Sequence, residues 1–217
     1  MALNKLKYNS LNLTPAANKA IGFDSDADAL EATLSGGAMV FIKKLTASDT
    51  STLSFINGSS DVVLDSTYKE YIFMFRDIHP ASDGVFLTFQ ADTGTNTNYN
   101  QTITSSYFTA YHFEDGSSSG LSYITSGDQA QGTSFQRVSQ QIGNDNDQAV
   151  SGTLQIFNPA DTTFVKHFIG NCASIANDDG PTNTFSAGYF NTTTALTRVQ
   201  FKMSSGNFDQ GSIALYG

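Results

Sequence analysis

The stretch Arg198-Val199-Gln200-Phe201-Lys202-Met203 alternates between polar and apolar side chains without a break. A period of two is the pattern of a β-strand that turns one face to a core, here the face of Val199, Phe201 and Met203. Ser205-Gly206-Asn207 then predicts a turn into a last strand over residues 212–216. The C-terminal end of the chain therefore predicts antiparallel β-structure.

Further strand patterns recur from residue 38 onward, separated by short polar turns. Asn57-Gly58 predicts a hairpin turn, because both residues tolerate positive φ. Ile72 to Phe75 is apolar on both faces, which predicts a central strand that packs on both sides or has one face at a subunit interface. The expected strands are 39–42, 53–56, 62–64, 68–78, 85–89, 101–113, 153–156, 164–169, 185–190, 198–203 and 212–216. Residues 114–120 and 126–134 are expected to be loops, and 134–142 is ambiguous.

The pattern predicts ten to twelve short strands with no βαβ spacing, so two packed antiparallel sheets are the expected solution. Among such sandwiches the jelly roll is our first choice. Composition agrees, because 25 Ser, 24 Thr, 16 Asn and a 12% aromatic share suit strands and turns better than helices. The fold class is therefore all-β, an antiparallel two-sheet sandwich, preceded by an extended N-terminal arm.

The first 36 residues differ in character from the rest. Lys5, Lys7 and Lys19 lie in residues 1–22, where no acid occurs, and Asp24, Asp26, Asp28 and Glu31 follow. Ser35-Gly36-Gly37 then predicts a flexible joint. We expect one short helical turn at most, within Ala27 to Leu34. The predicted organisation is an attachment and oligomerisation arm over 1–36 and a β-sandwich domain over 37–217.

The net charge of −9 and the low proportion of charged residues, 14%, limit the classes of partner that we expect. Nucleic-acid binding normally needs a basic face, so it is not expected. An acidic surface repels anionic membranes, and no apolar run approaches the roughly 20 residues of a membrane span. The first ten residues hold no apolar core of a secretory signal, so we expect assembly in a cytoplasm.

Two sequence motifs resemble catalytic or metal-binding patterns. The first lacks the structural context of its pattern, and the second lacks required residues. Gly116-Ser117-Ser118-Ser119-Gly120 matches the nucleophile elbow formally, but no helical pattern follows it. Asp24-x-Asp26-x-Asp28 resembles the start of an EF-hand loop, yet its sixth and twelfth positions hold Ala29 and Ser35. A hydrolase and an EF-hand are therefore not expected.

Single residues offer little more chemistry. The cluster Asn144-Asp145-Asn146-Asp147 is expected to be a hydrated turn, with part of a Ca²⁺ site as the open alternative. The only cysteine, Cys172, is expected to be a structural thiol. His79, His112 and His167 show no zinc spacing, and Tyr99, Tyr107, Tyr111 and Tyr123 are expected to be mostly packed rather than sugar-stacking. We predict no catalytic, cofactor-binding or metal-binding residue and no cofactor.

Four stretches of the chain carry a family resemblance. They are 199–217 (VQFKMSSGNFDQGSIALYG), 63–73 (VLDSTYKEYIF) with 77–80 (DIHP), 143–148 (GNDNDQ) and 157–168 (FNPADTTFVKHF). These stretches are similar to parts of the structural, tail-fibre-like virion proteins of marine and cyanobacterial tailed phages. The resemblance covers most of residues 38–217, and the arm from Lys5 to Leu34 also looks like the segment before this domain in those proteins.

The resemblance implies a component of a phage particle and supplies no catalytic motif. We expect a tail-fibre or adhesin module, not an enzyme, displayed on the virion for host-receptor binding. Its expected partners are other virion proteins through the arm and a host surface glycan, and the fibre analogy suggests a homotrimer. A capsid decoration protein is the first alternative. The second is a glycan-degrading enzyme with an acid pair such as one that includes Glu114.

Overall fold

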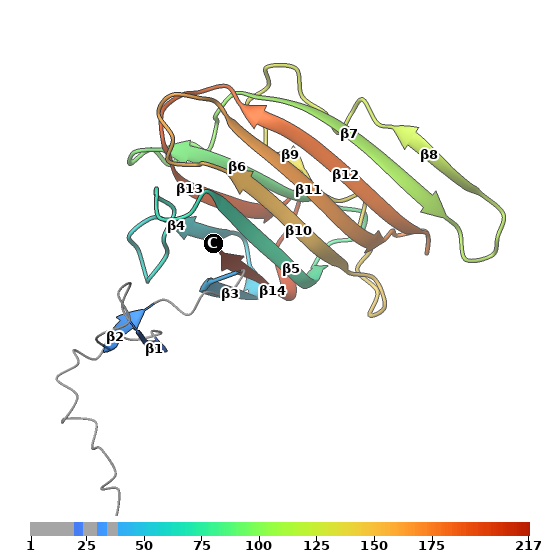
Figure 1. Cartoon of the computed structure of the whole chain (residues 1–217). Helices are drawn as coiled ribbons and strands as arrows, with labels where there is room; N and C mark the ends of the chain where they lie inside the picture. The colour runs from blue at the N-terminus through green and yellow to red at the C-terminus, as the bar shows by residue number, and fades with distance from the viewer. Residues whose placement is uncertain (1–19, 24–29, 34–38) are drawn as a thin grey trace, which may run out of the picture. The chain divides into compact units, whose positions relative to one another are not determined.

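The computed structural model describes residues 20–23, 30–33 and 39–217 (Figure 1). The chain divides into two units, Met1–Val40 and Phe41–Gly217. In the first unit, β1 (Ala20–Phe23) and β2 (Leu30–Thr33) form an antiparallel pair. The helical turn expected within Ala27 to Leu34 is therefore wrong for residues 30–33. A single helical turn is costly to nucleate, whereas pairing with β1 satisfies the backbone groups of β2. The acidic motif that starts at Asp24 falls outside the described residues.

The second unit is a sandwich of two antiparallel sheets, as predicted, and none of the residues described lies in a helix. The eight-stranded sheet comprises, in spatial order, β3 (Phe41–Thr50), β14 (Phe208–Tyr216), β5 (Glu70–Pro80), β10 (Val150–Phe157), β11 (Lys166–Ile175), β12 (Pro181–Phe190), β7 (Ile103–His112) and β8 (Ser119–Tyr123). The four-stranded sheet comprises β4 (Leu53–Ile56), β13 (Leu196–Met203), β6 (Leu87–Thr93) and β9 (Gln136–Arg137).

The strand order is that of a jelly roll with two insertions. When β7–β8 and β11–β12 are set aside, eight strands of the second unit remain. The first of these eight pairs with the last, the second with the seventh, the third with the sixth and the fourth with the fifth. These pairs are β3 with β14, β4 with β13, β5 with β10 and β6 with β9. This nested order is a long hairpin rolled into two sheets, which is the expected jelly roll. The insertions lengthen the larger sheet beyond β10 (Figure 1).

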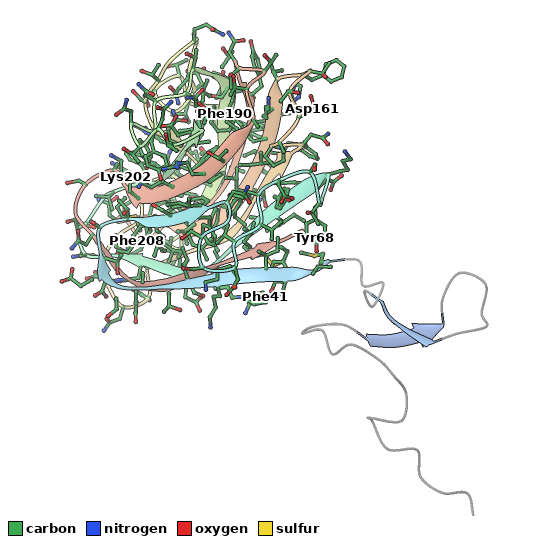
Figure 2. All side chains as sticks on the ribbon, turned by 90° about the vertical axis from the view of Figure 1, so that its left-hand side faces the viewer. Phe41, Tyr68, Asp161, Phe190, Lys202 and Phe208 are labelled. Atoms are coloured by element: carbon green, nitrogen blue, oxygen red, sulfur yellow. The ribbon has the colours of Figure 1, made fainter. Side chains whose placement is uncertain are left out.

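The core between the sheets is rich in phenylalanine. Phe201 on β13 lies at its centre, and its ring centroid is 5.1 Å from Phe73, 5.4 Å from Phe75, 6.2 Å from Phe55 and 6.3 Å from Phe89. All five side chains are at most 2% exposed. Figure 2 shows how side chains fill the space between the two sheets. Burial of this apolar surface is the main source of stability for the fold.

The alternation of β13 is confirmed, because Val199, Phe201 and Met203 are all buried. The opposite face is less exposed than its polar side chains suggest. Arg198 is buried as well, and its Nη2 donates a hydrogen bond to the carbonyl oxygen of Gly94 over 3.0 Å. The strand lies between β4 and β6, so both of its edges are paired.

The hairpin predicted around Asn57-Gly58 is only half right. The turn forms, with Gly58 at φ +76°, but residues 62–64 are not a strand. The side-chain Oδ1 of Asn57 instead accepts a hydrogen bond from the backbone N–H of Leu64 over 2.9 Å. Val62 and Leu64 are buried, so the segment is apolar because it enters the core as a loop. Strand β4 pairs with β13, which is far away in sequence.

Three other expected boundaries move. Residues 114–120 are not entirely loop, because Ser119 and Gly120 begin β8 and pair with β7. The strand expected at 164–169 runs instead from Lys166 to Ile175 and contains the polar stretch around Cys172. The first strand begins at Phe41 and extends to Thr50. In each case pairing with a neighbouring strand outweighs local polarity.

Candidate functional site

A trough crosses the outer face of the eight-stranded sheet, where β7 and β11 end and where β12 and β10 begin. Figure 1 shows these four strands side by side. Its volume is about 630 Å³. In the middle of the trough, Ala173 of β11 pairs with Asn183 of β12, which pairs with Ala110 of β7. Small side chains in register leave a depression across the strands. Further lining residues are apolar (Ala149, Ile175, Pro181) or polar (Asp77, His112, Asp147, Ser151).

A row of aromatic side chains lies beside the trough on the same face. The row consists of three residues in register, Phe185 on β12, Phe108 on β7 and Tyr123 on β8. Phe185 and Phe108 are two residues along their strands from Asn183 and Ala110 of the trough. Tyr123 is two residues from Leu121, which pairs with Ala110. Side chains two residues apart on a strand point to the same side of a sheet. The rings of Phe108 and Phe185 stack with centroids 5.0 Å apart and planes 12° apart. Phe108 is 37% exposed and Tyr123 is 54% exposed, so this row contacts solvent.

At the other end of the trough, Asp77 lies in an irregular part of β5. The pairing of β5 with both neighbours, β10 and β14, shifts register there. Asp77 has φ +48°, and a side chain on Gly211 opposite would place its Cβ 2.5 Å from the carbonyl oxygen of Asp77. The backbone N–H of Asp77 donates to Oγ of Ser151 over 3.0 Å. Bulges of this kind re-aim side chains and are common at functional sites.

A second hollow, the polar groove, lies across β5, β14 and β3. Its volume is about 830 Å³, and it shares Asp77 with the trough. Lys44, Arg76 and Asp209 line it together with Ser212 and other polar residues. Two basic and two acidic side chains therefore face this groove, whereas the charged side chains that line the trough are Asp77 and Asp147.

The loop Asn144–Asp147 borders the trough through Asp147. It is a hydrogen-bonded turn, because the N–H of Gln148 donates to the carbonyl oxygen of Asp145 over 2.9 Å. His79 fastens this loop, with Nε2 lying 3.1 Å from the same carbonyl oxygen and Nδ1 lying 3.1 Å from Oδ2 of Asp209. His79 is buried, so it links β5 to β14 and to the loop.

Within residues 39–217 and the two short strands of the first unit, no group of three His, Cys, Asp or Glu side chains could hold a metal ion. The turn expected at Asn144–Asp147 is present. Calcium binding by this loop is the alternative, and it is tested by the melting temperature with and without calcium.

The serine-rich motif Gly116–Gly120 spans the end of the hairpin turn between β7 and β8 and the first two residues of β8. Gly116 has φ +72°, and the N–H of Ser117 donates to Oδ1 of Asp115 over 2.8 Å. Hydrogen bonding from the side chain and then from the backbone of Ser117 holds the pKa of the Asp115 carboxyl below its usual range. The local geometry is a strand-to-strand turn, not the strand-to-helix turn of a nucleophile elbow. Glu114 is exposed in the same turn and does not line the trough.

Cys172 lies on the inner face of β11 and is fully buried. Burial raises the pKa of its thiol to about 12, so the group is protonated at neutral pH and cannot act as a thiolate nucleophile. Tyr99 and Tyr107 are also buried, and the hydroxyl of Tyr107 donates to the carbonyl oxygen of Ser139 over 2.6 Å. Of the four tyrosines considered from sequence, Tyr123 alone is more than half exposed, and Tyr111 lines the trough half-buried.

The trough and the aromatic row were not predicted from sequence. Alternation along 101–113 places Phe108, Ala110 and His112 on one face of a strand, and this signal was available. Their partners Phe185 and Asn183 lie on β12, and Ala173 lies one strand further on, on β11. Nothing local to 101–113 indicates that these strands are its neighbours.

Comparison of the chain with protein-family models, curated proteins and solved structures finds no match. Among the described residues, no helix has the length and apolar character required to cross a membrane.

Proposed function

We propose that this chain is a structural protein of a tailed-phage particle, and that its jelly-roll unit is a tail-fibre adhesin module that binds the host surface. The observation that carries the binding role is the trough with its bordering aromatic row on the outer face of the larger sheet. The proposal that the chain belongs to a phage particle is supported by the resemblance of most of residues 38–217 to virion proteins. Residues 1–36 are the proposed docking arm toward other virion proteins.

The outer face suits a surface-binding role because its parts are held by a paired sheet. The trough is lined from five adjacent strands, each hydrogen-bonded to its neighbours, so its shape does not depend on a single loop. Behind it, Ser174 and Thr182 join β11 to β12 through hydroxyl groups 2.7 Å apart. The segment that contains Gln140 is hydrogen-bonded to β12, because the N–H of Gln140 donates to Oγ1 of Thr184 over 3.1 Å. A preformed site loses little ordering entropy on binding.

The test is binding of the fluorescently labelled chain to cells of the bacterium that the encoding phage lyses. We expect labelled cells, and we expect loss of the label after periodate oxidation of the cell-surface glycans. Absence of binding to untreated cells contradicts the adhesin role. Binding to empty capsids without binding to cells would indicate capsid decoration instead, and release of reducing ends from host polysaccharide would indicate the glycan-degrading enzyme.

A further inference from the structure

We infer that the trough binds a neutral polysaccharide chain that lies across the strands, with about four sugar rings in contact. This inference rests on the proposed function, because it names the ligand class of the same outer face. Three features of the trough carry it: its direction and length, the chemistry of its lining, and its charge.

The trough follows the pairing direction of the sheet. From Ala110 on β7 through Asn183, Ala173 and Ser151 to Asp77 on β5, its lining crosses five neighbouring strands. Strands are spaced by about 4.8 Å, so five strands give a length of about 19 Å, which accommodates roughly four pyranose rings.

The lining combines the two kinds of contact that a sugar ring requires. A pyranose has apolar C–H faces and hydroxyl groups around its edge. Ala110, Ala173 and Ile175 offer apolar contact inside the trough, and the row of Phe108 and Phe185 offers aromatic surface beside it. Hydroxyl groups can bond to the polar lining, namely the carboxylates of Asp77 and Asp147, the hydroxyl of Ser151 and the amide of Asn183.

Charge selects against acidic polysaccharides. Asp77 and Asp147 line the trough, no Lys or Arg is among its lining residues, and the whole chain carries a net charge of −9. A uronate or sulfate group in the trough would meet two carboxylates and find no cation in the lining, and like charges in contact are repulsive. A neutral sugar avoids this repulsion and uses the carboxylates as hydrogen-bond acceptors.

The experiment is calorimetric titration of the full chain with neutral gluco-, manno- and galacto-oligosaccharides of two, four and six residues, and with hexagalacturonate. At least one neutral series is expected to bind, with affinity rising at least tenfold from the disaccharide to the tetrasaccharide. Hexagalacturonate is expected not to bind. Failure of every neutral hexasaccharide at millimolar concentration, or tighter binding of hexagalacturonate, would overturn the assigned ligand class.

Variants locate the site. Ala173→Arg puts a long side chain into the trough and is expected to lower the affinity at least tenfold. Ala130→Arg is the matched control, because Ala130 is also an exposed alanine but lies outside the trough. If Ala173→Arg lowers the melting temperature, Asn183→Ala serves as the milder variant, with an expected loss of at least threefold. Unchanged affinity in these trough variants would overturn the assignment.

The two proposals fail in different ways. If the wild-type chain binds host cells and Ala173→Arg binds them equally well, the adhesin role holds and the trough is not its site. If the wild-type chain binds neither cells nor virions, the proposed function itself fails. Loss of both cell binding and oligosaccharide binding in Ala173→Arg, with Ala130→Arg unchanged, supports both proposals.

Discussion

Replacing Phe201 by alanine is expected to cost about 4 kcal/mol of unfolding free energy, because the ring lies at the centre of the core. Its side chain is fully buried, and four other phenylalanine rings surround it at 5.1 to 6.3 Å. Removal of a buried phenylalanine side chain costs about 3–5 kcal/mol, which includes the cavity that remains. The total free energy of unfolding of a typical domain is only about 5–15 kcal/mol. The melting temperature is therefore expected to fall by about 8–16 °C.

Urea denaturation and a thermal scan, both followed by circular dichroism, measure this change. Phe164→Ala is the control, because Phe164 is the same residue type but is 70% exposed in the loop before β11. Its cost is expected to stay within about 0.5 kcal/mol. Equal effects of the two substitutions, or a loss below about 1 kcal/mol for Phe201→Ala, would refute the jelly-roll core described above.

Three further predictions test other parts of the molecule. The thiol of Cys172 has a pKa of about 12 in the fold against 9.0 for the free group, so above pH 9 only the unfolded state loses this proton. Between about pH 8 and pH 10, wild-type unfolding free energy should therefore fall by about 1.4 kcal/mol more than that of Cys172→Ala, and parallel urea-derived profiles would contradict this. His79→Ala removes both contacts that tie the 144–147 loop to β5 and β14 and should cost about 1–3 kcal/mol by urea denaturation; an unchanged midpoint would be inconsistent with this role. A chain of residues 37–217 should stay folded by circular dichroism but fail to join particles, and an unfolded truncation would disprove the separate docking arm.

The calcium alternative for Asn144–Asp147 is tested by melting temperature with and without calcium or a chelator. A ligand that binds only the folded state raises the melting temperature, so an unchanged value removes the alternative. The expected homotrimer is tested by the solution mass of the full chain.

Local patterns predicted two strands that are interior in their sheets. The alternation of 198–203 predicted β13. The apolar run around Ile72 to Phe75 predicted a central strand, and β5 does lie between β14 and β10. Packing on both faces was wrong for the described unit, because Ile72 and Met74 on the outer face are only partly buried, and an interface on that face stays a prediction. The second strand of the hairpin predicted after β4 does not form. Strand β4 pairs with the distant β13, and the side chain of Asn57 accepts a hydrogen bond from the loop that follows the turn. Local preference loses to nonlocal pairing at such positions.

The candidate site was less accessible to sequence reasoning than the fold. The trough depends on Ala110, Asn183 and Ala173 being neighbours. Strands β11 and β12, which carry Ala173 and Asn183, are joined by a short turn, but Ala110 lies on β7, much earlier in the chain. Strand order is set by the packing of the whole sheet, so no window of sequence contains it. Exposed Phe108 and buried Tyr107 are adjacent in sequence, and only the face of the strand separates an aromatic surface residue from a core residue.

The central claim, a protein displayed on the tail of a phage particle, is tested most directly by immunogold electron microscopy. Antibody raised against residues 37–217 would be applied to intact virions of the phage that encodes the chain. The account predicts gold at the tail fibres or the tail tip. Gold over the head, or no gold on any particle, would contradict it.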